Sequence, residues 1–390
     1  MDFSLTEREQ TFLDDLRSYL DSLVLPSEIG PRPELHDESR KTRATLFRRL
    51  NDDGWLGVAW PPEYGGRGGT PIEQWLYLEE MAWRRLPNRT PSLTAVGPTL
   101  IRVGSVEQKQ TYLPGILNGE IEFALGYSEP NAGSDLAALE TRAHRENGRY
   151  VVNGSKLWTT SAHFATHVWL AVRTDPDMPR HAGISVLIVP LDADGITVRP
   201  VETQADIRTN AVFFDNVAVD AENLVGDEND GWRIITTALN FERFFLYSDQ
   251  ARDFDDLVAW CASKHEGAGP PINDDNVRAE LAKLAVDLEI ARLLCMRTAW
   301  MIGEGDVPHS EASMVKVWTS EMRQRIADTA LNIMGEVGQL RRGTQGAPSD
   351  GTFEWLYRFA TMPKFAGGTN EIQRNIVAQR GLGLSREARR

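Results

Sequence analysis

The chain has 390 residues, 41% hydrophobic and 25% charged, so it can form several domains with sizeable cores and is not expected to be disordered. Its net charge of -14 excludes a nucleic-acid-binding protein, because no long segment supplies clustered Lys and Arg. The charged start and the lack of a long apolar run predict a cytoplasmic protein without a signal peptide or membrane span. Cys261 and Cys295 lie far apart without a CxxC motif, which fits a reducing compartment, and Cys295 is predicted to be a core residue.

Residues 5–119 carry a helical pattern that begins with a capping box, because Thr6 and Glu9 have the spacing at which a hydroxyl and a carboxylate cap each other's backbone amides. Ser105 and Gln108 mark a second helix start of the same kind. Apolar residues recur on one face of the first helix: Phe12, Leu16, Tyr19, Leu20 and Leu23. We therefore predict an all-helical N-terminal domain over residues 1–119.

Residues 120–225 consist of short runs rich in Val, Ile, Thr and Phe, separated by turn residues. Asn147 and Gly148 form the dipeptide that is typical of a two-residue hairpin. Further strands are predicted at residues 168–173, 184–191 and 211–219. Because no helix of crossover length lies between them, we predict an antiparallel sheet or barrel and not a Rossmann unit.

Helical spacing returns beyond Gly231 and continues to the end of the chain. The clearest seam alternates three and four residues apart, as in a helical bundle: Leu281, Leu284, Leu288, Ala291 and Cys295. Residues 226–390 are therefore predicted to form a four-helix bundle. The predicted fold class is a multi-domain α+β protein with a helical domain, a middle antiparallel β domain and a C-terminal bundle.

Short motifs occur along almost the whole chain, and they are specific only as a set. They are Gly54-Trp55, Trp60-Pro61, Tyr64-Gly65-Gly66, Gly126-Tyr127-Ser128-Glu129-Pro130, Ala132-Gly133-Ser134-Asp135-Leu136, Asn153-Gly154-Ser155-Lys156-Leu157-Trp158-Thr159-Thr160, Gly226-Asp227-Glu228-Asn229-Asp230-Gly231-Trp232 and Gly367-Gly368-Thr369-Asn370-Glu371-Ile372-Gln373-Arg374. In this order of domains, the chain resembles the acyl-CoA dehydrogenase family. The resemblance implies that family's fold and an FAD-dependent oxidoreductase activity.

Five residues of these motifs are candidates for binding FAD. Tyr127 and Ser128 end an apolar strand, where backbone groups and a hydroxyl can bond the edge of an isoalloxazine ring. Trp158 can cover a face of the ring, and Thr160, two residues along what we predict to be the same strand, projects to the same side to donate near N5. The resemblance implies the same roles and adds Thr369. The plain alternative is a core tryptophan and a strand threonine.

The reaction implied by the resemblance is α,β-dehydrogenation of an acyl-CoA thioester, in which a base takes the α proton while a hydride leaves the β carbon for FAD N5. Many family members carry the base where this chain has Gly367. Another family placement corresponds to Glu242, whose apolar neighbours favour desolvation, and Glu371 is the alternative base. The resemblance also implies that Arg243 and Ser134 contact the CoA part of the substrate, and that the N–H of Gly367 polarises the thioester oxygen.

Two departures from the family pattern concern the FAD of a neighbouring subunit. The pyrophosphate-binding arginine is absent from Glu266-Gly267-Ala268-Gly269-Pro270-Pro271, and Asn332-Ile333-Met334-Gly335-Glu336 places a carboxylate where phosphates would approach. The chain thus resembles the base-bearing subunit of actinobacterial heterotetrameric enzymes that shorten steroid side chains. The implied partners are a second dehydrogenase-like subunit or a second copy of the chain, and an electron-transfer flavoprotein. The implied acyl group is bulky or branched.

Other interpretations stay open or are set aside at this stage. A non-catalytic subunit that binds CoA or a partner, and an acyl-CoA oxidase, are the alternative functions. A hydrolase is rejected because Gly126-Tyr127-Ser128-Glu129-Pro130 ends in proline where a nucleophile elbow needs glycine. No metal site is predicted, because His163 and His167 lack an accompanying carboxylate motif. A cluster of aspartates favours a solvated helix face over a cation site: Asp249, Asp253, Asp255 and Asp256.

Overall fold

The structure is a computed structural model that describes residues 3–23, 40–87, 90–241, 247–265 and 269–385. Contacts between residues divide the chain into two compact units. Unit 1 takes in the described residues of the ranges Met1–Val24, Thr70–Leu86 and Phe244–Arg390, and unit 2 takes in those of Leu25–Gly69 and Pro87–Arg243.

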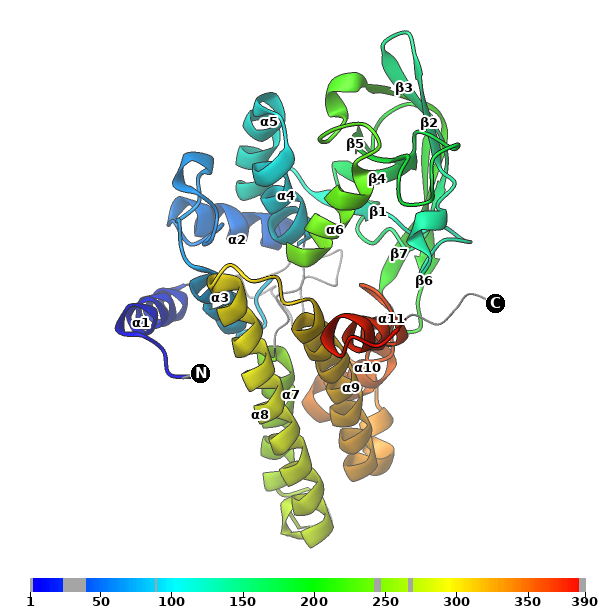
Figure 1. Ribbon diagram of the computed structural model, residues 1–390. Helices are drawn as coiled ribbons and strands as arrows, with labels where there is room; N and C mark the ends of the chain where they lie inside the picture. The colour runs from blue at the N-terminus through cyan, green and yellow to red at the C-terminus, as the bar shows by residue number, and fades with distance from the viewer. Residues whose placement is uncertain (1–2, 24–39, 88–89, 242–246, 266–268, 386–390) are drawn as a thin grey trace. The chain divides into compact units, whose positions relative to one another are not determined.

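Unit 1 is helical among its described residues. Its helices are α1 (Glu7–Ser22), α3 (Pro71–Trp83), α7 (Ser248–Ala262), α8 (Asp275–Gly303), α9 (His309–Met334), α10 (Thr352–Phe359) and α11 (Asn370–Ile376). The long helices α8 and α9 lie side by side, and α7, α10 and α11 also pack against α9 (Figure 1). The predicted seam of α8 is buried throughout, including Cys295, so the predicted C-terminal bundle is confirmed.

Capping boxes start two of the helices where the sequence predicts them. The Thr6 hydroxyl accepts from the N–H of Glu9, and the Glu9 carboxylate accepts from the N–H of Thr6 at 2.7 Å, at the start of α1. Ser105 and Gln108 do the same for α5 (Val106–Leu117) in unit 2. These reciprocal bonds satisfy amides that the first helical turn leaves without partners.

Unit 2 combines short helices with one sheet. Its helices are α2 (Arg40–Asp52), α4 (Gly97–Val103), α5 and α6 (Gly231–Phe241), and its strands are β1 (Phe123–Gly126), β2 (Arg142–Glu146), β3 (Arg149–Lys156), β4 (His167–Arg173), β5 (Ile184–Pro190), β6 (Ile196–Glu202) and β7 (Arg208–Asp220). Shorter helical turns lie at Pro62–Tyr64, Ser92–Val96, Leu136–Ala138, Ala221–Asn223, Pro271–Asn273, Gly335–Gln339, Pro348–Gly351, Met362–Lys364 and Val377–Gly381 of the chain. The sheet has seven strands in the order β1-β4-β2-β3-β7-β6, with β5 paired to β4.

The β2–β3 hairpin turns at Asn147 and Gly148 as predicted, with φ angles of 49° and 80° that suit a type I′ turn. The β2–β3, β3–β7, β4–β5 and β6–β7 pairs are antiparallel, as predicted, but β1 pairs with β4 in parallel. The hairpin lies between these two strands in sequence, so it supplies the long connection that parallel pairing needs without a helix. Strand β6 was not predicted; it is an edge strand, in which Pro200 is tolerated.

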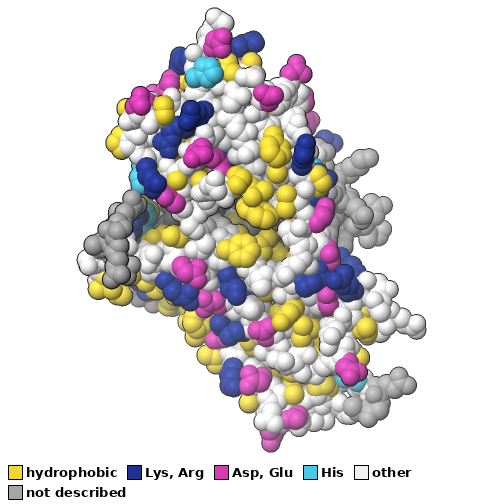
Figure 2. Space-filling model, turned by 90° about the vertical axis from the view of Figure 1, so that its right-hand side faces the viewer, with side chains coloured by type: hydrophobic (Ala, Val, Ile, Leu, Met, Phe, Trp, Pro, Cys, Tyr) yellow, Lys and Arg dark blue, Asp and Glu magenta, His cyan; other side chains and the backbone are white. Residues whose placement is uncertain are grey.

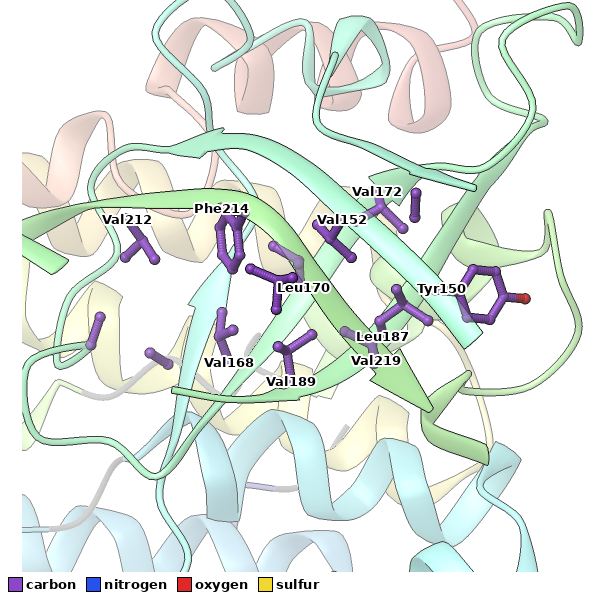
Figure 3. Packing of buried hydrophobic residues seen from close by; sticks show 14 of the residues in the cluster. Tyr150, Val152, Val168, Leu170, Val172, Leu187, Val189, Val212, Phe214 and Val219 are labelled. Carbon is purple, nitrogen blue, oxygen red and sulfur yellow. The ribbon is translucent and has the colours of Figure 1, made fainter. Parts of the chain in front are cut away.

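The core of the sheet is formed by side chains that alternate along four strands, β3, β4, β5 and β7, and point toward one another (Figure 3). The labelled members are Tyr150, Val152, Val168, Leu170, Val172, Leu187, Val189, Val212, Phe214 and Val219. The sheet therefore curls around its own core, and this rigid framework carries the segments that leave β1 and β3.

The observed order of helices, strands and helices confirms the predicted fold class. The boundaries at residues 1–119, 120–225 and 226–390 stay a prediction. No helix in the described ranges is long and apolar enough to cross a membrane. On the face drawn in Figure 2, basic and acidic side chains are interspersed and do not form one basic surface.

Candidate functional site

The first part of the candidate site is the chain that leaves β1. Tyr127 and Ser128 follow this apolar strand directly, as predicted. Tyr127 is buried and Ser128 is half-buried. The carbonyl oxygen of Ser128 accepts from the N–H of Leu157 at 2.9 Å, so the segment leaving β1 lies against the segment leaving β3. The structure thus brings Tyr127 and Ser128 close to the chain that carries Trp158.

The second part is the turn that follows β3. The prediction that Trp158 and Thr160 lie on one strand is wrong, because β3 ends at Lys156 and the N–H of Thr160 donates to the carbonyl oxygen of Trp158 at 3.0 Å. Trp158 has a φ of 64°, in the left-handed region. The strand stops here because the N–H of Thr159 bonds the carbonyl oxygen of Asn210 and no longer continues a regular ladder.

Asn210, a fully buried residue of β7, holds this turn in place. Its Nδ2 lies 3.0 Å from the carbonyl oxygen of Thr159 and 3.0 Å from Nδ1 of His163. Next to it in sequence, the hydroxyl of Thr209 lies 3.2 Å from that of Thr160. Sequence reasoning missed Asn210, although a polar residue within the Val- and Phe-rich run of β7 was an available signal.

The turn has two features that fit a planar, hydrogen-bonding ligand such as a flavin. Trp158 is 57% exposed although its backbone is held in a conformation that costs roughly 1–3 kcal/mol. The buried hydroxyl of Thr159 has no hydrogen-bond partner among the residues that the structure describes. Backbone strain and an unpartnered buried polar group are expected where a site is shaped for a ligand and not for stability.

A buried ion pair links the two segments. Nζ of Lys156 donates to Oε1 of Glu129 at 2.7 Å and to the carbonyl oxygen of Tyr127 at 3.0 Å. Burial alone would raise the pKa of the Glu129 carboxyl, but the charge of Lys156 and its hydrogen bond outweigh burial and lower this pKa. The motifs contain both residues, yet sequence reasoning gave them no role.

Ser134 lies in the exposed turn between β1 and β2, beside Asp135, which pairs with Arg180. A hydroxyl in this position is accessible to a ligand. The contact of Ser134 with the CoA part of the substrate stays a prediction.

The C-terminal motif forms a glycine turn in unit 1. Gly367 and Gly368 have φ angles of 63° and 88°, so this turn favours glycine at both positions. The hydroxyl of Thr369 accepts from the N–H of Ile372 at 3.2 Å and caps α11. Nε2 of Gln373 donates to the carbonyl oxygen of Gly367 at 3.3 Å. Gly367 is exposed in this turn, and the bond from Gln373 holds its backbone.

Lys316, a buried residue of α9, bonds the residues on both sides of this turn in the sequence. Its Nζ donates to the carbonyl oxygen of Lys364 at 2.9 Å and to Oδ1 of Asn370 at 2.7 Å. Burial lowers the pKa of Lys316 to about 8. This lysine is another residue that sequence reasoning did not single out.

The proposed base Glu242 and its neighbour Arg243 lie outside the described residues. They follow α6, and the next described residues begin α7. There, the N–H of Ser248 donates to the buried carboxyl of Glu79 at 2.9 Å. Glu371, the alternative base, is exposed in the first turn of α11.

The other polar clusters noted in the sequence have structural partners. His163 bonds Asn210, and Nδ1 of His167 lies 2.9 Å from the Thr166 hydroxyl. The favoured interpretation of the aspartate cluster as a solvated face is wrong for Asp253, which is fully buried and pairs with Arg85 at 3.2 Å. No group of three or more His, Cys, Asp or Glu side chains among the described residues is arranged to hold a metal ion.

Comparison with known proteins covers the whole chain. Residues 6–120 match the acyl-CoA dehydrogenase N-terminal domain, residues 124–217 match its middle domain, and residues 229–382 match its C-terminal domain. The acyl-CoA dehydrogenase FadE26 of Mycobacterium tuberculosis is 36% identical, with 100% of both chains covered.

Two solved structures share the fold over nearly the full length. The Tcur3481-Tcur3483 steroid ACAD has a TM-score of 0.91 and 37% identity, covering 99% of this chain and 100% of that chain. The ChsE4-ChsE5 complex from Mycobacterium tuberculosis has a TM-score of 0.89 and 36% identity, with the same coverage.

Proposed function

Because this chain belongs to the acyl-CoA dehydrogenase family, we propose that it catalyses the FAD-dependent α,β-dehydrogenation of an acyl-CoA thioester. The observation that carries the proposal is the exposed Trp158, which has a left-handed backbone and lies beside the segment of Tyr127 and Ser128. An indole held out in this way offers a flat apolar face to a ring, while the adjoining backbone offers hydrogen bonds to the edge of that ring.

In this proposal the residues of unit 2 bind and orient the flavin ring. Tyr127 and Ser128 bond its edge, Trp158 covers one face, and the Thr160 hydroxyl donates near N5. Thr369 contributes to cofactor binding from its place at the start of α11. FAD, when bound, supplies a hydride acceptor for the β carbon of the substrate.

The proton chemistry falls to Glu242, which removes the α proton. Its support comes from the sequence around it and from the exposure of Glu371, since a base at this step needs a desolvated carboxylate with a raised pKa. The N–H of Gly367 polarises the thioester oxygen, which makes the α proton more acidic. Ser134 and Arg243 contact the CoA part of the substrate.

The proposed substrate is a bulky or branched acyl-CoA such as a steroid side chain. Support comes from the relative named a steroid ACAD. The proposed assembly includes a different dehydrogenase-like subunit, because residues 266–271 contain no arginine and Glu336 is an exposed carboxylate where a phosphate-binding group would be needed. An electron-transfer flavoprotein would reoxidise the cofactor.

Substitution of the base tests the proposal directly. Glu242→Gln should abolish dye-coupled dehydrogenation of acyl-CoA, because an amide cannot accept the α proton, while bound FAD stays at the wild-type level. Glu371→Gln is the matched control and should retain activity. Activity retained in Glu242→Gln would overturn the assignment of the base.

A second measurement addresses the subunit arrangement. The chain is purified alone and together with the product of a neighbouring dehydrogenase-like gene, and flavin absorbance is recorded for both samples. We expect FAD and activity only in the joint sample. A lone chain that binds one FAD and is active would contradict the need for a different partner, and an inactive joint sample would favour the non-catalytic alternative.

A further inference from the structure

We propose that the buried ion pair of Glu129 and Lys156 positions the segments leaving β1 and β3 for the flavin ring, and that Lys156 strengthens the N–H of Ser128 as a hydrogen-bond donor. This inference rests on the proposed function, because it concerns the same ring site. Both are positioning residues, since they act through the backbone of Tyr127 and Ser128.

The pair is closed off from solvent. The side chain of Lys156 is 0% exposed and that of Glu129 is 7% exposed. Two backbone N–H groups complete the shell of the carboxylate: Glu140 donates to Oε2 at 2.7 Å and Thr141 donates to Oε1 at 2.9 Å. Lys156 therefore ties the exits of β1 and β3, through Glu129, to the start of β2.

Lys156 acts on one particular peptide group. Its Nζ lies 3.0 Å from the carbonyl oxygen of Tyr127. In a planar trans peptide the C=O and the N–H point in opposite directions, so the N–H of Ser128 points away from Lys156. A charged donor on the C=O polarises the peptide, which makes its N–H a stronger donor to whatever lies on the other side.

Stability alone is a weak reason for such a pair. Removing two charges from water is costly, and apolar residues of similar volume often serve stability as well or better. The pair is instead suited to fixing geometry, because one ammonium group and one carboxylate constrain three strand ends at once. The bond from the Leu157 N–H to the Ser128 carbonyl oxygen, one residue along from Lys156, lies in the same constrained region.

The test replaces the charges but keeps the shape. In the full-length chain, in the assembly in which it holds FAD, Glu129→Gln combined with Lys156→Gln leaves a neutral amide pair. The matched control combines Arg43→Gln with Glu122→Gln, which neutralises another largely buried ion pair of unit 2, at the start of β1. Circular dichroism and urea unfolding verify that both variants are folded.

We expect the dissociation constant of FAD to rise roughly tenfold in the Glu129/Lys156 variant, because a neutral hydrogen bond replaces a charge-assisted one, and to change little in the control. The flavin reduction potential should become more negative in that variant, since the reduced ring carries more negative charge and loses more from a weaker donor. The potential of the control should stay at the wild-type value.

Equal behaviour of the two variants would overturn the inference and leave the pair a structural feature. If the neutral pair fails to fold, Lys156→Arg is compared with the wild-type protein: a wild-type potential supports the inference, and a shift as large as that expected for the neutral pair overturns it. Failure of the wild-type assembly to bind FAD would instead refute the proposed function, and the inference with it.

Discussion

Asn210 and Thr159 hold each other through two hydrogen bonds: the N–H of Thr159 donates to the carbonyl oxygen of Asn210 at 2.9 Å, and Nδ2 of Asn210 donates to the carbonyl oxygen of Thr159 at 3.0 Å. The two residues lie on different segments, one after β3 and one within β7. The left-handed turn at Trp158 is therefore anchored to the sheet by the backbone and the side chain of one buried residue.

Asn210→Ala should lower the free energy of unfolding by about 1–3 kcal/mol, because it leaves the buried carbonyl of Thr159 without the side-chain donor. It should also weaken FAD binding by releasing the turn. Urea unfolding and FAD titration measure the two effects. Asn153→Ala, which removes a more exposed amide of β3 that bonds Asn216, is the control and should leave FAD binding unchanged.

Trp158→Gly separates folding from ligand binding at one position. Trp158 is 57% exposed and its φ of 64° suits glycine, so the free energy of unfolding should stay the same or rise by up to about 1 kcal/mol. FAD affinity should fall nonetheless, because the ring loses its apolar cover. Trp300→Ala on α8 removes another partly exposed indole and should leave FAD affinity unchanged. A Trp158→Gly protein that binds FAD normally would contradict the role of the indole.

Glu79 should make the stability of unit 1 depend on pH. Burial raises the pKa of its carboxyl from 4.5 to about 7, against the opposing hydrogen bonds from Ser248 and Tyr247. The folded state then binds the proton more tightly than the unfolded state. Its contribution is fully present below pH 4.5 and is lost as pH rises to about 7, a loss of up to about 3 kcal/mol. Urea unfolding of Glu79→Gln and of the wild type, from about pH 5 to about pH 8, measures this loss of unfolding free energy.

The control for this pH effect lies on the same helix. Burial alone would raise the pKa of Glu73, but hydrogen bonds from Arg8 and Thr70 outweigh burial and lower it below 4.5. The contribution of Glu73 is therefore present above pH 4.5 and is lost as pH falls further. Glu73→Gln should therefore show the same decrease of unfolding free energy above about pH 5 as the wild type. The same slope in Glu79→Gln and wild type would contradict the prediction for Glu79.

Lys316→Met should destabilise the protein by about 1–3 kcal/mol, because it leaves the carbonyl oxygen of Lys364 and the buried Oδ1 of Asn370 without their charged donor. The turn at Gly367 should shift as well, which lowers kcat more than it raises KM if the Gly367 amide acts on the reacting thioester. Lys283→Met breaks an exposed pair with Glu280 on α8 and should leave the free energy of unfolding, kcat and KM unchanged.

Much of the fold could be predicted because local physics and global packing agree. The hairpin at Asn147 and Gly148, the cap at Thr6 and the buried seam containing Cys295 each follow from a pattern within a few residues. The parallel pairing of β1 with β4 could not be predicted in this way, since it depends on contacts distant in sequence.

The identity of the site residues stays a prediction, and the geometry of the turn that carries Trp158 could not be predicted from the sequence. A regular strand would place Trp158 and Thr160 on the same side. The strand ends at Lys156, however, and the N–H of Thr159 bonds the carbonyl oxygen of Asn210. The ion pair of Glu129 and Lys156 could not be predicted for a related reason. Charged residues are most often exposed to solvent, and the motif alone does not show that these two are buried. For Glu242 and Arg243 the assignment remains a prediction from sequence.

The distribution of the chain between the two units constrains the order in which the protein can fold during synthesis. All residues of unit 2 have been made once the ribosome passes Arg243, whereas α3 of unit 1 packs against α8, which is translated much later. The buried side chains of α3 include Trp75, Leu76 and Met81, and the contact between α3 and α8 can form only after α8 has been translated. A nascent chain stalled before α8 would leave α3 without this contact, so chaperones that bind apolar helices can bind α3 during this stage of synthesis.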